Sequence, residues 1–288
     1  MYAIDTEDSE IQKVFKQIYN LELQSLLSKE HHPDFTENQF YHLYKTHYYW
    51  WSFISGDDSK NFKELALQSI ESGVSALSNK SRRELSREEI FILVSLHGFS
   101  SRISMLDEKL WPAFRSMEET MSLIRIVLRN TNNNYDPYNL LAGIYLYNMD
   151  HLIRSYPIFY PAVIFYPKGD REKGFDYLHK AAKSDNLLIS VEANYFLMKI
   201  YADLENDFTN ALIHAVNLIE VAPENYIFQY YYVKSLKNLG YPETVLERRV
   251  NNILSKLNLN SELPLSSKQH LEKEMKSLLA SSTASVKH

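Results

Sequence analysis

The sequence predicts an all-α fold, an α-solenoid of about five helical hairpins with capping helices at its ends. Helical hydrophobic periodicity runs nearly from end to end of the 288 residues, and only seven glycines and nine prolines interrupt it. Similar segments also recur around Ala211 and Val245, which are 34 residues apart. A fixed period of this length is typical of helix–turn–helix units that stack on one another and bury a continuous core.

The period is that of the tetratricopeptide repeat, so the solenoid is expected to be tetratricopeptide-like. Ala211 is the small residue expected where two helices cross, and Pro223 ends the second helix because it has no N–H to donate. In the next unit, Gly240 is expected to relieve crowding in the turn. Two features depart from the pattern: the turn at 203–210 is one residue longer, and Val245 replaces the small residue.

A first amphipathic helix is predicted from Ser9 to Ser28, followed by a break at His31–Asp34. The hairpins that follow are predicted at 36–78, 87–130, 137–183, 188–222 and 225–258.

Three local signals support these limits. Ser86 and Glu89 have the spacing of a capping box, Pro137 suits a first helical position, and Asp170 is expected to cap the helix that begins at Arg171. After a break at Leu263–Pro264, a last helix is predicted. The expected organisation is an N-terminal capping helix at 1–32, a repeat domain at 33–260, and a C-terminal helix with a polar tail at 261–288.

Composition limits the function classes. The absence of cysteine excludes disulfides and thiolate metal sites. No run of about 18 apolar residues occurs, so no membrane span is predicted. The net charge of −5 is weak and the basic pairs are isolated, so no nucleic-acid partner is expected. Met1 is followed by acidic residues rather than a leader, so the expected location is cytoplasmic if Met1 is the native start and periplasmic if a leader was removed. The oligomeric state stays open.

The middle of the chain resembles a known family. The relevant residues are Asp136-Pro137-Tyr138, Gly143-Ile144-Tyr145-Leu146-Tyr147, a proline-rich aromatic insert, Gly169 to Phe175, Leu178, Ala181 and Ala182. Together with Tyr48 to Trp51 and His97 to Arg102, they resemble bacterial tetratricopeptide-repeat proteins that are frequent in Bacteroidetes and distantly similar to the inclusion-body-clearance repeat family. The likeness covers residues 33–258. It implies an all-helical repeat fold in which Gly143, Gly174 and Ala181 are structural positions, no known catalytic residues, and frequent export across the inner membrane.

The densest aromatic cluster lies on the predicted helix at 36–54. Tyr41, Tyr44, Tyr48 and Trp51 share one face of this helix, and further aromatic residues spread over its other faces. A helix that is aromatic nearly all round must be covered on most sides. Two interpretations therefore stand: burial between neighbouring helices, or an exposed stripe that anchors a peptide in the concave groove.

The second candidate is the insert, residues 156–167, whose three prolines exclude one continuous helix. The insert is expected either to be a structural plug tucked across the groove or to be a partner-binding surface. Its candidate binding residues are Phe159, Tyr160, Phe165 and Tyr166.

No motif indicates catalysis, a cofactor or a metal site. His42 and His47 are five residues apart and do not share a helix face, and there is no His-Glu-x-x-His pattern. Adjacent acidic pairs point apart on a helix and make poor acid–base pairs.

The predicted function is therefore non-enzymatic binding of another protein or peptide, as a scaffold or adaptor, through the concave aromatic groove or the insert. The alternative is a small-ligand carrier with an aromatic pocket between the helix at 36–54 and the insert.

Overall fold

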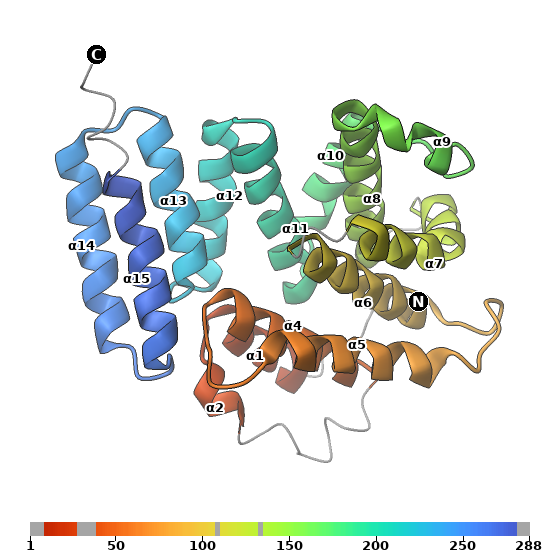
Figure 1. Ribbon diagram of the computed structural model, residues 1–288, viewed down its shortest axis with the longest axis horizontal. Helices are drawn as coiled ribbons and strands as arrows, with labels where there is room; N and C mark the ends of the chain where they lie inside the picture. The colour runs from red at the N-terminus through yellow and green to blue at the C-terminus, as the bar shows by residue number, and fades with distance from the viewer. Residues whose placement is uncertain (1–8, 28–38, 107–109, 132–134, 281–288) are drawn as a thin grey trace. The chain divides into compact units, whose positions relative to one another are not determined.

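The computed structural model describes residues 9–27, 39–106, 110–131 and 135–280, and this part of the chain is helical with no β-strand (Figure 1). The predicted all-α class is confirmed. The elements are α1 (Ser9–Tyr19), α2 (Leu23–Leu27), α4 (Tyr41–Ile54), α5 (Phe62–Leu77), α6 (Arg87–Leu106), α7 (Leu110–Arg129), α8 (Asp136–Ser155), the 3-10 turn η1 (Pro157–Phe159), α9 (Tyr160–Val163), α10 (Arg171–Ala181), α11 (Leu187–Lys199), the π-helical turn η2 (Ile200–Leu204), α12 (Phe208–Val221), α13 (Tyr226–Asn238), α14 (Glu243–Leu259) and α15 (Leu265–Ala280).

Some predictions lie outside the described residues. These are the break at His31–Asp34, the start of the first hairpin at 36, and the polar tail within 281–288.

The predicted helix starts are confirmed in detail. The Ser86 N–H donates to Glu89 Oε2 at 2.8 Å, and the Glu89 N–H donates to Ser86 Oγ at 3.1 Å, which is the reciprocal pair of a capping box. Asp170 caps α10 by accepting the Lys173 N–H at 3.0 Å. Pro137 lies in the first turn of α8, where its missing N–H leaves no bond unmade.

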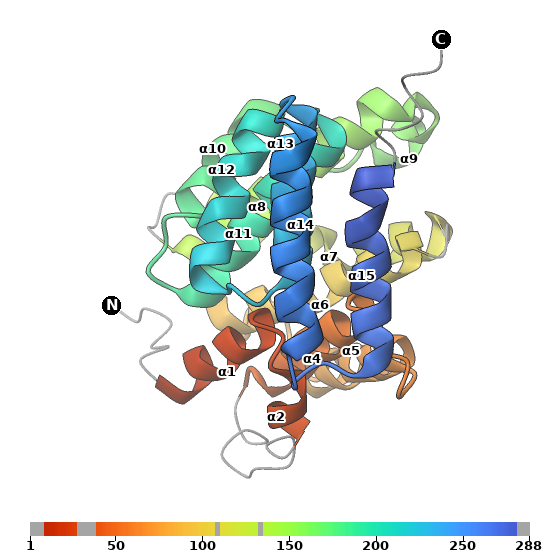
Figure 2. The ribbon, with the colours of Figure 1, turned by 90° about the vertical axis from the view of Figure 1, so that its left-hand side faces the viewer.

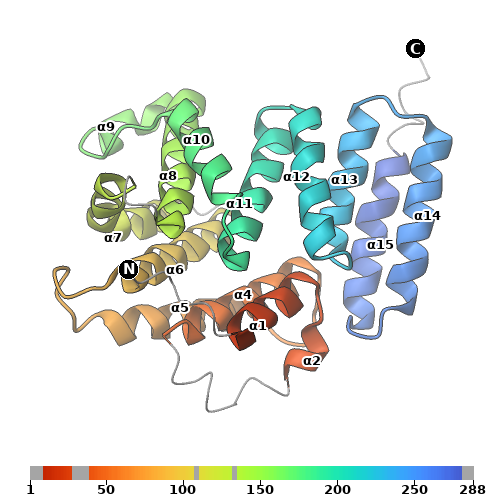
Figure 3. The ribbon, with the colours of Figure 1, turned by 180° about the vertical axis from the view of Figure 1, so that it is seen from behind.

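Contacts divide the chain into two compact units, each made of separate stretches. One contains residues 33–47 and 63–193, and the other contains residues 10–32, 48–62 and 194–288. In the first unit, α6 packs against α7 and α8 packs against α10, and α8 also contacts α6 and α7 (Figure 3). The predicted domain limit near residue 32 lies outside the described residues, and the limit near residue 260 falls between α14 and α15. Both limits stay predictions.

In the second unit, α13 packs against α12, α14 and α15 (Figure 2). The N-terminal helix α1 belongs to the same unit. Its end is bonded to the start of α13, because Asn225 Nδ2 donates to the Tyr19 carbonyl at 2.7 Å and the Glu224 N–H donates to Asn20 Oδ1 at 2.9 Å. Segments about 200 residues apart in the sequence therefore form one packed body.

In the first unit, α8 and α10 cross at close range. A methyl group placed on Gly174 would lie 2.8 Å from the Tyr147 backbone nitrogen, and one on Gly143 would lie 2.9 Å from the Leu178 backbone nitrogen. Ala181, further along α10, is fully buried. The backbones therefore approach closely only because these positions lack bulky side chains.

In the second unit, Ala211 is fully buried within α12. This helix ends at Val221, two residues before Pro223, which cannot continue it. Asn225 then begins α13, and its side chain accepts two backbone N–H bonds at the first turn.

The end of α11 contains an extra residue. The Glu205 N–H donates to the Ile200 carbonyl at 3.0 Å, five residues back, so this turn is a π-helix. A π turn inserts one residue into an α-helix, which accounts for the extra residue that the sequence shows next to the turn at 203–210. Asn206 follows with φ of 54°, a left-handed conformation that asparagine tolerates.

Gly240 has a different role from the one expected. Nothing lies within 4 Å of a methyl group placed on it, so it relieves no crowding. Its φ of 78° is left-handed, and the Tyr241 N–H donates to the Leu236 carbonyl while the Gly240 N–H donates to the Lys237 carbonyl. This is the Schellman arrangement that ends a helix, so glycine is needed for its conformation.

Candidate functional site

The aromatic residues of α4 are mostly buried. Tyr44, Tyr48 and Trp51 are exposed by 5%, 4% and 0%, and Tyr41 is half-buried beside His42 and Lys45. Of the two interpretations of this cluster, burial describes three of its four members.

Trp51 is the centre of an aromatic core in the second unit. Its ring lies 5.8 Å from that of Tyr19, 5.5 Å from that of Tyr195 and 5.5 Å from that of Phe228, measured between centroids. Tyr48 packs edge-on against Phe62 in the same unit. These side chains fill helix seams and leave no exposed aromatic stripe at Tyr48 or Trp51.

The insert forms short helical pieces. Pro157 is the first residue of η1, and Pro161 lies in the first turn of α9. At the start of a helix the missing N–H of proline is tolerated, whereas inside a helix it breaks the hydrogen-bond pattern. The prediction that no continuous helix crosses the insert is confirmed.

The insert exposes large apolar side chains. Ile158 and Phe165 are exposed by 84% and 83%, and Tyr156, Tyr160 and Ile164 by 57%, 51% and 55%. Of the four predicted binding residues, Tyr160 and Phe165 are exposed and Phe159 and Tyr166 are half-buried. Val163, which was not among them, is buried. A run of exposed apolar residues over ten positions is unusual on a protein surface and marks an interaction site more often than isolated exposed residues do.

Hydrogen bonds fix the insert to α7 and α8. The Tyr145 hydroxyl donates to the Pro167 carbonyl at 2.7 Å, and Arg125 Nη2 donates to the Phe165 carbonyl at 2.8 Å. Burial raises the pKa of the Tyr145 phenol, which keeps it protonated as a donor. The apolar side chains are therefore presented from a backbone held at defined points.

Gly169 closes the insert onto α8. A methyl group on Gly169 would lie 2.1 Å from the Asp150 backbone nitrogen, so only glycine fits at this approach. The neighbouring Asp170 N–H donates to the Leu146 carbonyl at 3.1 Å. Both ends of the insert therefore meet α8, which makes it a short closed protrusion.

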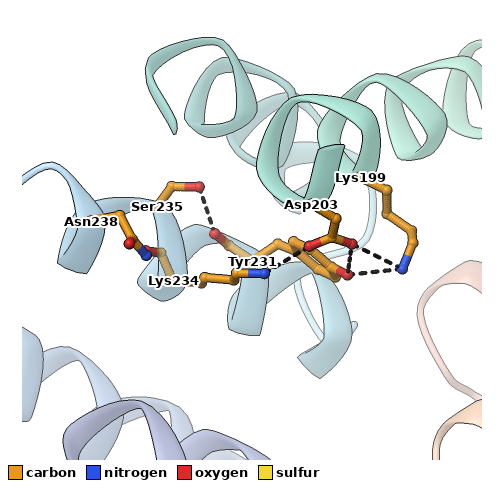
Figure 4. A network of polar contacts seen from close by, with 6 residues as sticks. All are labelled: Lys199, Asp203, Tyr231, Lys234, Ser235 and Asn238. Carbon is orange, nitrogen blue, oxygen red and sulfur yellow. Dashed lines mark hydrogen bonds and ion pairs between the residues drawn. The ribbon is translucent and has the colours of Figure 1, made fainter. Parts of the chain in front are cut away.

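A polar network in the second unit was not expected from the sequence. Figure 4 shows Asp203, in the π-helical turn, between the ammonium groups of Lys199 and Lys234. Asp203 accepts from Lys234 at 2.7 Å and from the Tyr231 hydroxyl at 2.7 Å, and lies 3.3 Å from the Lys199 ammonium. Lys199 also donates to the Tyr231 hydroxyl at 2.8 Å.

The pKa directions in this network suit fixed charges. Burial opposes the charge on Asp203, but bonds from Lys234 and Tyr231 and the charge of Lys199 outweigh it and lower the pKa of the carboxyl. Burial likewise opposes the charge on Lys199, but the neighbouring tyrosines and Asp203 raise its pKa. Burial raises the pKa of Tyr231. None of these three shifts moves a pKa toward neutrality, where general acid–base groups are most effective. The network therefore suits a structural role, in which it holds η2 against α13.

A second charged cluster is buried in the first unit. His47 Nδ1 lies 3.8 Å from Glu192 Oε1, and Arg102 Nη2 donates to Glu192 Oε2 at 3.2 Å. The His47 ring meets Phe99 edge-on, and the Arg102 guanidinium lies over the same ring. Burial lowers the pKa of His47 to about 4, with Glu192 opposing the shift and Arg102 adding to it.

Acid should destabilise the protein through His47. Its pKa is about 4 when folded and 6.5 in the unfolded reference, so the unfolded chain binds more protons between these values. The stability that depends on neutral His47 is therefore fully present above pH 6.5, and it is lost as the pH falls from 6.5 to 4. The difference between these two pKa values corresponds to roughly 3 kcal/mol. In His47→Gln, the free energy of unfolding from urea titrations should depend less steeply on pH between 4 and 6.5.

The control is His270→Gln, because His270 is exposed. This variant should keep the wild-type slope. A slope that is equally steep in wild type and His47→Gln would contradict the assignment of the acid sensitivity to His47.

The described part of the chain contains no group of three His, Asp or Glu side chains placed to hold a metal ion. Among the described helices, α6 alone has the length and composition to cross a membrane, but half of that stretch is buried in the protein, as in an ordinary core helix. The expectation of no membrane span stays a prediction.

Comparison of the chain with protein-family models, with curated proteins and with solved structures gives no match.

Proposed function

We propose that the protein is a non-enzymatic helical-repeat protein of the tetratricopeptide-like type that binds another protein or peptide through the insert. The observation that carries this proposal is the exposure of Ile158 and Phe165, above 80% each, on a segment bonded to α7 and α8. Preformed apolar surface binds with less ordering of the binding segment than a flexible loop would need.

The two surfaces predicted from the sequence differ in their support. The groove alternative needs accessible aromatic side chains on α4, and Tyr44, Tyr48 and Trp51 are buried among neighbouring helices. A carrier pocket lined by these residues meets the same difficulty. The insert needs no rearrangement to present its side chains, so it is the preferred binding surface.

The double variant Ile158→Ser/Phe165→Ser should lose binding without losing stability. Both side chains are exposed, so the free energy of unfolding should change by about 0.5 kcal/mol or less per site. Binding is measured with peptides selected from a phage-displayed random library against the wild-type protein. Selected peptides should bind the wild type and fail to bind the double variant.

The matched control is Leu259→Ser/Leu265→Ser. Leu259 and Leu265 are exposed by 86% and 69%, and both belong to the other unit. This variant removes similar apolar surface and should bind the same peptides as the wild type. If no selected peptide depends on Ile158 and Phe165, the insert is not the binding surface.

A further inference from the structure

The apolar surface of the insert has a basic border. The chain from 151 to 169 contains Arg154 and Lys168 but no acidic residue. A third cation, Arg125, reaches the insert from α7 and donates to the Phe165 carbonyl. All three side chains are exposed.

Two carboxylates partly offset the local charge. Asp150 lies 2.6 Å from Arg154 Nε, one helical turn away. A second carboxylate, Asp170, lies 3.1 Å from the Lys173 ammonium, so four cations against two carboxylates leave a local excess of two positive charges, although the whole chain has a net charge of −5. The border is therefore opposite in sign to the rest of the protein.

The border charge distinguishes the possible occupants. In a symmetric dimer formed through two inserts, the same patch faces itself, so two basic borders would meet and repel. A partner with carboxylates around an apolar segment would instead be attracted and correctly oriented.

The residue types favour a protein partner over a lipid surface. Tyrosine and arginine are enriched at the energetic centres of protein interfaces. The insert exposes Tyr156 and Tyr160, and its basic border contains Arg125 and Arg154. Electrostatic lipid binding commonly uses clusters of about 4–8 lysines and arginines, more than the three in the basic border.

We infer that the occupant of the insert is an apolar segment of another protein bordered by aspartate or glutamate. This inference rests on the proposed function, since it names the partner class for the same surface. Ile158 and Phe165 supply the apolar contact, and Arg125, Arg154 and Lys168 select the acidic border.

The peptide selection tests two claims separately: that the insert is the binding surface, and that its partner has an acidic border. Sequencing of peptides that depend on Ile158 and Phe165 should show apolar cores with Asp or Glu on at least one side, compared with the unselected library. Peptides that need the insert but have neutral or basic borders would overturn this inference and leave the proposed function intact. A selection with no insert-dependent peptide would overturn both.

Charge reversal gives the second measurement. Arg154→Glu/Lys168→Glu should weaken binding of a selected acidic-bordered peptide by about tenfold at low salt, with a smaller difference in high salt. The control Arg248→Glu/Arg249→Glu makes the same charge change at exposed residues of the other unit and should leave the affinity unchanged. Equal affinities of the insert variant and the wild type would contradict the inference.

Vesicles provide the last arm. Neutral phosphatidylcholine vesicles and vesicles containing phosphatidylserine should both fail to sediment the protein. Sedimentation with the anionic vesicles that is lost in Ile158→Ser/Phe165→Ser would assign the surface to a membrane instead of a protein segment.

Discussion

Replacing Trp51 by alanine should lower the free energy of unfolding by about 3–5 kcal/mol, the range for large aromatic side chains removed from a core. Trp51 is fully buried, and the rings of Tyr19, Tyr195 and Phe228 surround it within 5.8 Å. These neighbours come from three other helical segments, so they cannot all move inward to fill the space. A cavity remains and adds to the lost transfer free energy.

The effect is measured by urea denaturation followed by far-UV circular dichroism, because the substitution removes a fluorophore. The control is Phe165→Ala, which truncates an aromatic residue exposed by 83% and should change stability by about 0.5 kcal/mol or less. Similar midpoints for Trp51→Ala and the wild type would mean that the aromatic core around Trp51 is not formed as described.

This contrast between Trp51 and Phe165 shows what sequence could predict. Both are aromatic and both were candidate binding residues, but composition alone does not reveal which one other helices cover. The helix pattern around Trp51 has apolar residues on most faces, which indicated burial. The neighbours that bury it are Tyr19, Tyr195 and Phe228, far apart in sequence, and no local pattern links them.

The local features were the most predictable. The capping box at Ser86 and Glu89, the cap at Asp170 and the end of α12 before Pro223 depend only on residues a few positions apart. Their physics is contained in the local sequence, since each satisfies backbone groups at one helix end. The stacking of the hairpins into a solenoid depends on longer-range packing and stays a prediction.

The polar network of Lys199, Asp203, Tyr231 and Lys234 shows the limit of such reasoning. Lys199 and Asp203 have the i,i+4 spacing of a helical ion pair, which was a readable signal. The π-helical turn that places Asp203 toward α13 had only an indirect signal, one extra residue before α12. Tyr231 and Lys234 lie about 30 residues further on, and only the packing of α13 brings them to Asp203.

The insert was predictable in its breaks but not in its exposure. Its prolines exclude a continuous helix, and its apolar residues favoured a buried plug slightly over a binding surface. Exposure depends on where the ends are fixed, and Gly169 fixes one end against the backbone of Asp150. Gly169 could be singled out from the sequence, but its contact with the backbone of Asp150 on α8 could not.

Gly174→Ala should destabilise the protein, although alanine normally favours a helix over glycine by about 1 kcal/mol. The new methyl group would lie 2.8 Å from the Tyr147 backbone nitrogen and 3.1 Å from its Cα. Backbone atoms cannot rotate away as a side chain can, so α8 and α10 must separate. Overpacking of this kind lowers the free energy of unfolding by about 1–3 kcal/mol.

Gly98→Ala is the matched control, because Gly98 lies inside α6 and nothing is within 4 Å of a methyl group placed there. The same chemical change should stabilise the protein by about 0.5–1 kcal/mol, since alanine loses less backbone entropy on folding. The two variants should therefore move the urea midpoint in opposite directions, with a gap of roughly 1.5–4 kcal/mol in the free energy of unfolding. A midpoint that rises in both variants would show that α8 and α10 do not cross at Gly174 as closely as described.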